Sequence, residues 1–454
     1  FSFYLRSDLV YTTANNDRFA VNDFSALPTN FIITQTYQRL FTVVATANTA
    51  VTVAKVLEGP GFTPEIKLRL EAEGKFLRAF TYYQLVRLFG RIPYVTDETL
   101  GQGIDVSKIS RSSVDDVYAG IIADLQFAQS NLPDKWTNNT RTRGTAGSAT
   151  GLLASVYLTQ NNYAAAYAEA KKVIDKATAY DYALLPNYID LFDASKANGL
   201  REHLFAIDFI FQGTTAGGIN DDILGAHLKP ILSPTPAGTT FTNGFGNVFA
   251  SSAIKSNLVW SNADRRKNIL TAYTNIYIAA NGRILADPAG GVPAGTIASV
   301  PVPANRNYVI AYNILAGNSQ ADGRESDINY GLLRYAEILL IASEALIEQN
   351  VSLGEAAGYI NQIRTRAGLA NTTASSQVDL RVALREERKW EFAFEFSRWF
   401  DIKRWKLLDL PEATHPFGPN GYEPKANFAS INWAAQYDYP IPQVAIDSNP
   451  NLSK

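Results

Sequence analysis

Residues 385–405, REERKWEFAFEFSRWFDIKRW, contain the carboxylates whose spacing is best suited to chemistry. If the stretch is one helix, Glu387, Glu391 and Glu395 recur every four residues and share a face. Glycosidases use two carboxylates about 5–9 Å apart, and an i, i+4 pair reaches the lower end of that range. A glycoside hydrolase is therefore one hypothesis for this chain.

The basic residues of the same stretch favour a structural interpretation. Arg385, Arg388, Arg398, Lys403 and Arg404 would keep neighbouring carboxylates ionised, whereas a catalytic acid must hold a proton. The three tryptophans and four phenylalanines fall on nearly all sides of a helix, which is typical of a buried helix whose charges are paired. We therefore expect an ion-paired scaffold helix at 385–405, no catalytic residues and no enzyme activity.

The overall composition argues against several classes of protein. Among 454 residues, 41 Lys and Arg stand against 43 Asp and Glu, so a net charge of −2 gives no positive field for nucleic acid or an anionic bilayer. The absence of cysteine removes disulfides, thiol catalysis and cysteine-based zinc sites. His203, His227 and His415 lack the spacing of metal ligands. We expect no nucleic-acid partner, no metal and no cofactor.

Sequence motifs for phosphate, dinucleotide or calcium binding and for a catalytic serine do not occur. The Gly-rich stretches 101–103 and 290–295 lack the strand-to-helix context of a phosphate loop. No apolar run approaches the roughly 18 residues that a membrane helix requires. The opening on Phe1, without an initiator Met, is typical of a mature or trimmed product.

Four regions are predicted as helical pairs, and two of them lie in the first third of the chain. One runs from about Pro64 to Gly90, because proline favours the start of a helix and glycine its end. The next follows Ser113, a suitable N-cap, and stops before Pro133.

Two longer segments, 144–175 and 330–369, each consist of two amphipathic halves with a hinge, at 160–162 and at 349–352. Alanines lie where the two halves would approach closely, which is typical of a tetratricopeptide helix pair. Because long unlike segments separate the pairs, we predict an interrupted array and not a tandem one.

Residues 213–329 differ in composition from the rest of the chain. They are rich in Gly, Pro, Thr, Asn and aromatic residues, as in SPTPAGTTFTNGFGNVF. Such a stretch is too long for a simple loop and predicts short strands and functional loops. We treat it as the candidate ligand side, between an N-terminal part, 1–212, and a C-terminal part, 330–454, which holds a helix pair, the scaffold helix and a loop-rich tail.

Several segments resemble one family and occur in its order. They are AEGKFLRAFTYYQLVRLFGRIPYVTDE at 72–98, SSVDDVYAGIIADLQFA at 112–128, TRGTAGSATGLLASVYLTQNNYAAAYAEAKKVID at 142–175, LLRYAEILLIASEAL at 332–346, INQIRTRAGL at 360–369, the 385–405 stretch and YPIPQVAIDSNPNL at 439–452. Together they resemble the SusD/RagB family of Bacteroidota outer-membrane lipoproteins. Phe396 departs from the glycine common in the family's scaffold signature, and DRR at 264–266 resembles a structural Asp-x-Arg element of the family.

The resemblance implies a fold and a role. It implies one SusD-like unit over 1–454, mainly α, whose tetratricopeptide-type pairs form a right-handed helical scaffold with loop-rich insertions and a few short strands. It also implies a nutrient-binding lipoprotein on the extracellular face of the outer membrane, held by an N-terminal lipid anchor that would precede Phe1. Such a protein covers a SusC-like TonB-dependent barrel and delivers glycans to it, or peptides in the RagB branch.

A sugar site needs exposed aromatic faces together with amide, carboxylate and guanidinium groups. Two segments combine them on expected loops. The first, YTTANNDRFAVNDF, offers Tyr11, Asn15, Asn16, Asp17, Arg18 and Phe24. The second offers Phe241, Phe245, Phe249, Trp260, Tyr273 and Tyr277. For each aromatic residue, ordinary core packing is the alternative.

The leading hypothesis is a surface glycan-binding protein that works with a transporter. The alternatives within the same architecture are a peptide-binding lid and a structural subunit of an outer-membrane complex. A glycoside hydrolase acting through Glu391 or Glu395, and a cytoplasmic tetratricopeptide scaffold, are the remaining hypotheses.

Overall fold

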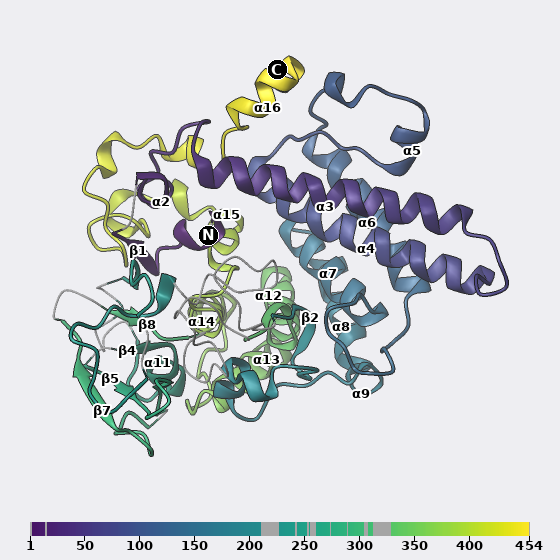
Figure 1. Cartoon of the computed structure of the whole chain (residues 1–454). Coiled ribbons are helices and arrows are strands. Elements are labelled where there is room, and N and C mark those ends of the chain that lie inside the picture. The colour runs from purple at the N-terminus through teal and green to yellow at the C-terminus, as the bar shows by residue number, and fades with distance from the viewer. Residues whose placement is uncertain are drawn as a thin grey trace.

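The computed structural model describes residues 2–13, 16–209, 227–240, 243–251, 254, 260–272, 274–287, 289–303, 307–311 and 328–453. Within these residues the fold is mainly helical, and short strands form three small antiparallel sheets (Figure 1). The helices are α1 (Ser2–Leu5), α2 (Asn16–Asn22), α3 (Phe31–Val56), α4 (Pro64–Phe89), α5 (Asp97–Gly101), α6 (Val114–Asn131), α7 (Ala146–Thr159), α8 (Tyr163–Asp175), α9 (Ala177–Tyr180), α11 (Arg265–Leu270), α12 (Tyr335–Gln349), α13 (Leu353–Arg366), α14 (Gln377–Glu391), α15 (Arg398–Arg404) and α16 (Gln443–Ser448). The strands are β1 (Val10–Thr12), β2 (His203–Ile207), β3 (Val248–Ala250), β4 (Thr271–Ala272), β5 (Asn275–Ile278), β6 (Ile284–Leu285), β7 (Ala298–Pro301), β8 (Tyr308–Val309) and β9 (Tyr330–Arg334).

The longest helices, α3 and α4, have 26 residues each and lie side by side (Figure 1). The side chain of Asn30 caps α3 by accepting hydrogen bonds from two backbone N–H groups of its first turn. Pro64 begins α4 and Gly90, at φ 63°, ends it, which confirms the predicted boundaries. Helix α3 was not predicted, because threonine, alanine and valine cover its exposed face and blur the amphipathic pattern.

The two helix pairs predicted with a hinge are confirmed, whereas the other two regions each form one helix, α4 and α6, and not a pair. Helix α7 ends at Thr159 and α8 begins at Tyr163, while α12 ends at Gln349 and α13 begins at Leu353. Helix α8 packs against both α7 and α12, so the two pairs join although 159 residues lie between Asp175 and Tyr335. Helix α6, which follows the predicted cap Ser113, packs between α4 and α7. The prediction of a mainly helical fold with interrupted helix pairs is confirmed.

Short strands connect distant parts of the chain. The sheet order is β1-β3-β8-β4 in one sheet, β2-β9 in a second and β6-β5-β7 in a third. Strand β1 pairs with β3 in the register Val10↔Ala250, so the N-terminal segment joins the loop-rich insertion. Residues 330–334, predicted as the start of a helix, form β9 instead. The backbone of β9 is extended because it pairs with β2 and is thereby buried.

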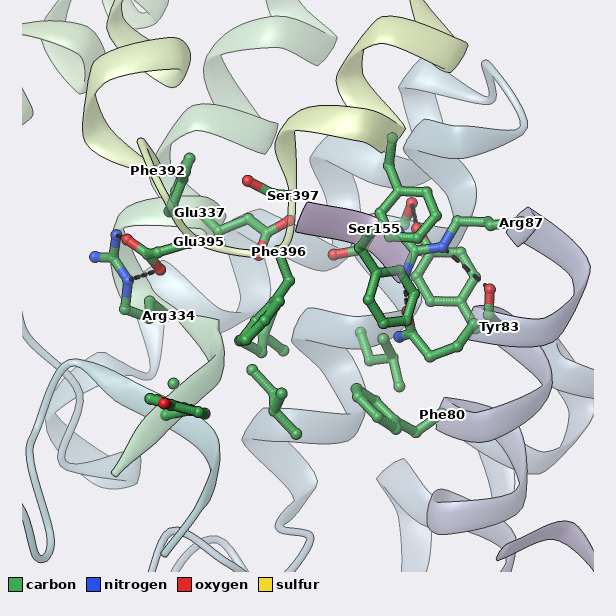
Figure 2. A pocket seen from close by; sticks show the side chains of 18 of the residues that line it. Phe80, Tyr83, Arg87, Ser155, Arg334, Glu337, Phe392, Glu395, Phe396 and Ser397 are labelled. Carbon is green, nitrogen blue, oxygen red and sulfur yellow. Dashed lines mark hydrogen bonds and ion pairs between the residues drawn. The ribbon is translucent and has the colours of Figure 1, made fainter. Parts of the chain in front are cut away.

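The prediction of one continuous helix over 385–405 is wrong. Helix α14 ends at Glu391, residues 392–397 form a turn, and α15 begins at Arg398. Phe394 takes a left-handed conformation at φ 65°, which a residue other than glycine adopts only where packing supports it, and its ring is buried. Burial of the aromatic rings thus overrides local helix propensity. The turn residue Phe396 lines a cavity between the helices (Figure 2).

The N-terminal segment meets α15 in the core. Arg398 at the start of α15 donates two hydrogen bonds to Asp8, at 2.7 and 2.6 Å, and both side chains are almost fully buried. Helix α1 packs against α15 near this pair. In the part of the chain that the structure describes, no helix has both the length and the apolar character needed to cross a bilayer.

Candidate functional site

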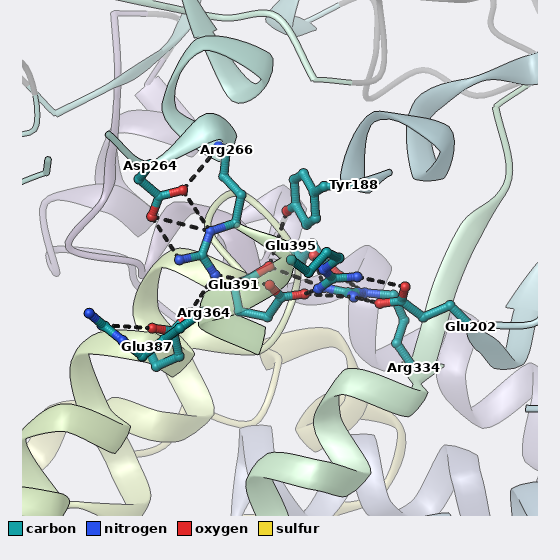
Figure 3. A network of polar contacts seen from close by, with 10 residues as sticks. Tyr188, Glu202, Asp264, Arg266, Arg334, Arg364, Glu387, Glu391 and Glu395 are labelled. Carbon is teal, nitrogen blue, oxygen red and sulfur yellow. Dashed lines mark hydrogen bonds and ion pairs between the residues drawn. The ribbon is translucent and has the colours of Figure 1, made fainter. Parts of the chain in front are cut away.

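A buried network of guanidinium and carboxylate groups connects α14 with the insertion (Figure 3). Arg266 donates to Asp264 at 2.7 Å, to Glu387 at 2.7 Å and to Glu391 at 3.0 Å. The side chain of Arg266 has no solvent exposure. The Asp264–Arg266 element therefore orders the core, which agrees with the structural role predicted for it.

The network continues to β9 through Arg334. This side chain donates to Glu202 at 2.5 Å, to Glu391 at 3.0 Å and to Glu395 at 2.6 Å, and Arg366 bonds both Glu202 and Glu391. Burial opposes the ionisation of Glu391, but the surrounding arginines, Arg366 first, outweigh it and lower the pKa of Glu391 to about 2. Glu391 therefore serves as the counter-ion of these arginines.

Glu395 differs from the other carboxylates of the network. Its side chain borders the cavity of Figure 2, and burial raises its pKa to about 7 despite the charge of Arg334. Glu387 and Glu391 have 2% and 0% of their side chains exposed, so a substrate has no access to them. The spacing that motivated the hydrolase hypothesis therefore serves ion pairing in this fold.

The predicted N-terminal residues have diverse surroundings. Tyr11, on β1, stacks on Phe249 of β3 with ring centroids 5.2 Å apart. The carboxylate of Asp17 accepts a hydrogen bond from the first backbone N–H of α3. Phe24 is buried among aromatic rings, with Phe417 at 4.8 Å. Asn16 begins α2, and Asn15 lies outside the described residues.

The structure brings Arg18 and Phe245 together around a histidine that sequence reasoning did not select. Arg18 Nη2 lies 3.3 Å from His227 Nε2, and the ring of Phe245 lies 4.7 Å from the imidazole. His227 Nδ1 contacts the side-chain oxygen of Asn247 at 3.0 Å. Burial, followed by the charge of Arg18, lowers the pKa of His227 to about 4, so the imidazole is neutral near pH 7.

Trp260 lies in the core. It is 1% exposed and stacks on Trp390 of α14, with ring centroids 4.5 Å apart and an interplanar angle of 13°. The packing interpretation thus accounts for Trp260 and for Phe24 in this structure. Phe241 and Tyr273 lie outside the described residues.

Tyr277, on β5, lines a polar cavity of about 490 Å³ in the loop-rich insertion. Its walls also carry amide, ammonium and carboxylate groups from Asn262, Lys267, Asn268, Asn275 and Asp287. The Asp287 carboxylate accepts hydrogen bonds from the backbone N–H groups of Ala289 and Gly291, which fixes the loop. A half-buried aromatic ring beside several amides is suited to a sugar, whose rings have apolar faces and hydroxyl edges.

Sequence reasoning missed the polar partners of Tyr277. The signal that could have identified them is the density of asparagine at 262, 268 and 275, before and at the start of β5. In the described residues, no group of three or more histidine, aspartate or glutamate side chains is placed to hold a metal ion.

A second cavity, of about 290 Å³, lies between α4, α7, β9 and the 392–397 turn (Figure 2). Its walls are mainly apolar and include the aromatic rings of Phe80, Phe396 and Phe400. Two carboxylates, Glu337 and Glu395, also border it. None of the predicted ligand residues lies on its walls.

Comparison with known families gives two matches. A model described as the SusD family matches residues 239–454, and a model described as starch-binding associating with outer membrane matches residues 6–158. SusD-like protein P2 of Formosa agariphila is 35% identical over 447 residues, which cover 95% of this chain and 82% of that protein. The starch-binding protein SusD of Bacteroides thetaiotaomicron is 26% identical over 437 residues, 87% of this chain and 74% of that protein.

Solved structures share the fold over nearly the whole chain. A SusD superfamily protein from Parabacteroides distasonis has a TM-score of 0.77 at 22% identity and covers 99% of this chain and 91% of its own. A laminarin-binding SusD-like protein has a TM-score of 0.76 at 21% identity, over 99% and 92%. A structure with a xylogluco-oligosaccharide has a TM-score of 0.77 at 20% identity, over 100% and 95%.

Proposed function

The chain belongs to the SusD family, and from this premise we propose that it binds carbohydrate at the bacterial cell surface. Two relatives support a glycan ligand: one is described as starch-binding and one as laminarin-binding. The observation that carries the proposal is the polar cavity of the insertion, where Tyr277 stands among amide and carboxylate groups.

The cavity would bind a glycan without chemical change to it. The ring of Tyr277 offers an apolar face for a pyranose, while Asn268 and Asn275 each offer a donor and an acceptor for hydroxyl groups. Lys267, which donates to the carbonyl of Trp260 at 2.9 Å, would place a positive charge beside these hydroxyls. The arrangement favours binding of one or two sugar units of a longer chain.

We further propose that the protein lies on the extracellular face of the outer membrane, held by an N-terminal lipid, and delivers its ligand to a SusC-like TonB-dependent barrel. The family model that matches residues 6–158 supports the membrane association. Affinity purification from native membranes tests the partner: recovery of one barrel protein is expected, and recovery of many unrelated subunits would favour an assembly role.

Calorimetric titration with starch, laminarin and xyloglucan tests the ligand class. We expect at least one polysaccharide to bind. Tyr277→Ala should weaken that binding about tenfold or more, because it removes one ring contact and its hydrogen bonding. Tyr157→Ala, which removes a half-buried tyrosine from α7, is the matched control and should bind normally.

Two results would contradict the proposal in different ways. Binding that Tyr277→Ala leaves unchanged would place the glycan site elsewhere on the protein. Failure of all polysaccharides, with binding of a peptide library instead, would favour the peptide-binding alternative.

A further inference from the structure

The cavity of Figure 2 adjoins a smaller polar chamber. The chamber has a volume of about 30 Å³, enough for one small polar group. Tyr83, Arg87, Ser155, Glu337, Ser397 and Phe400 line both spaces. The combined site is therefore apolar along most of its length and polar at one end.

The apolar part is formed by rings that keep exposed surface. Phe80, Phe396 and Phe400 are half-buried, and neighbouring rings hold them in place: Phe205 lies 5.3 Å from Phe80 and Phe3 lies 5.6 Å from Phe400. A volume of about 290 Å³ lies at the lower end of the range for small-molecule sites. The space suits one six-membered ring with a short substituent.

The polar end holds hydrogen-bonding atoms that the protein leaves unused. Arg388 Nη1 and Ser397 Oγ are buried and have no hydrogen-bond partner among the described residues. Arg388 itself is 3% exposed and is held by Asp401 through its other nitrogens. Glu337 Oε1 lies 4.0 Å from Arg388 Nη2, beyond hydrogen-bond distance. Buried polar groups are normally satisfied, so the Arg388 Nη1 and Ser397 Oγ atoms point to a ligand, with the partly exposed Glu337 beside them.

The charges on the walls are balanced. Arg334 is paired with Glu395, and the guanidinium of Arg87 lies over the rings of Tyr83 and Phe400 at 3.7 and 3.6 Å. The chamber adds Arg388, Arg404 and Asp401, and Arg404 is also paired with Glu344 behind the wall. With that partner included, four arginines face four carboxylates, so the formal charges sum to zero and favour neither a cation nor an anion.

We propose that this cavity binds a small uncharged molecule in which an aromatic or alicyclic ring carries a hydroxyl group. The ring would lie among Phe80, Phe396 and Phe400. The hydroxyl would accept from Arg388 Nη1 and donate to Glu337 or Ser397. An ammonium group cannot accept a hydrogen bond, and a carboxylate would face Glu337 without a proton to donate. The site is separate from the polar cavity around Tyr277, so it does not depend on the proposed glycan function.

Ligand-observed NMR with benzyl alcohol tests the proposal, with benzylamine and benzoate as charged probes of the same size. We expect benzyl alcohol to bind at least tenfold more tightly than either charged probe. Ser397→Ala should weaken the binding of benzyl alcohol about tenfold, because it removes one buried hydrogen bond. Ser155→Leu should block the junction of the two spaces and abolish binding. Ser130→Leu on the exposed face of α6 is its matched control.

Glu337→Gln separates a hydroxyl site from a cation site. The amide still hydrogen-bonds a hydroxyl, so binding of benzyl alcohol should change less than threefold. Preferred binding of benzylamine that Glu337→Gln removes would overturn the proposal, as would an absence of benzyl alcohol binding to the wild-type protein. Equal binding by wild type and by a Ser155→Leu variant with native circular dichroism would also overturn it. Tyr277→Ala should leave benzyl alcohol binding unchanged.

Discussion

Trp260 and Trp390 stack with their planes 13° apart and join the loop-rich insertion to α14. Trp260→Ala should lower the free energy of unfolding by about 3–5 kcal/mol, because it leaves a large cavity in a packed core. Chemical denaturation measures the change. Tyr277→Ala, at a half-buried position, should cost less than about 1 kcal/mol. A Trp260→Ala protein of unchanged stability that no longer binds glycan would contradict the core assignment.

The arginine–glutamate network should be essential for stability. Glu391→Ala leaves three buried guanidinium groups with one fewer counter-ion and should destabilise the protein by about 3–5 kcal/mol, or prevent folding. Urea titration followed by circular dichroism measures the loss. Asp175→Ala, which removes an exposed i, i+4 pair with Lys171, should cost less than about 1 kcal/mol. Similar losses of unfolding free energy for both variants would show that burial of the network adds nothing to stability.

The network should also make stability depend on pH. Glu202, Asp264, Glu387, Glu391 and Glu395 face Arg266, Arg334, Arg364 and Arg366, one carboxylate more than the guanidinium groups. This excess agrees with the raised pKa of Glu395, about 7 against an ordinary value of 4.5, for which burial is the main cause.

Between about pH 4.5 and 7 the folded protein therefore holds a proton that the unfolded chain has released. The free energy of unfolding gains this contribution fully below pH 4.5 and loses it as pH rises through 7. Glu395→Gln should flatten this slope, which unfolding curves at pH 5, 6, 7 and 8 measure. A wild-type slope identical to that of Glu395→Gln would contradict the assignment.

Helices α3 and α4 approach closely at Gly74. A Cβ atom at this position would lie 2.8 Å from Val51 Cγ2 and 3.3 Å from the carbonyl oxygen of Ala47. Gly74→Ala should therefore destabilise the protein by about 1–3 kcal/mol through overpacking. Gly358→Ala, on the open face of α13, meets nothing within 4 Å and should stabilise by about 0.5–1 kcal/mol. Thermal denaturation compares the two, and a stabilised Gly74→Ala protein would contradict the close approach.

Local signals predicted much of the fold. Pro64, Gly90 and Ser113 mark helix ends through backbone chemistry that depends only on neighbouring residues. The helix-pair hinges follow from the same local patterns. The break at Phe394 depends instead on where its ring is buried, and the extended backbone of 330–334 depends on pairing with β2. Such long-range contacts are not encoded in local periodicity.

The candidate site was less predictable for a related reason. Trp260 and Tyr277 are both aromatic residues in one loop-rich segment, yet one is buried by Trp390 and the other borders a polar cavity. Composition cannot distinguish the buried ring from the one that lines a cavity, because the partner that covers Trp260 lies 130 residues away. His227 was set aside for lack of metal-ligand spacing, whereas its place beside Arg18 arises only when β1 joins β3.

The buried pair of Asp8 and Arg398 closes a loop of nearly the whole chain. During synthesis Asp8 leaves the ribosome among the first residues, and its partner follows almost 400 residues later. The helical pairs contain mostly local contacts and can form as they emerge, but this part of the core must wait for α15. Until then the N-terminal segment leaves exposed to water the apolar side chains that pack against α15 in the folded protein, Phe3 among them.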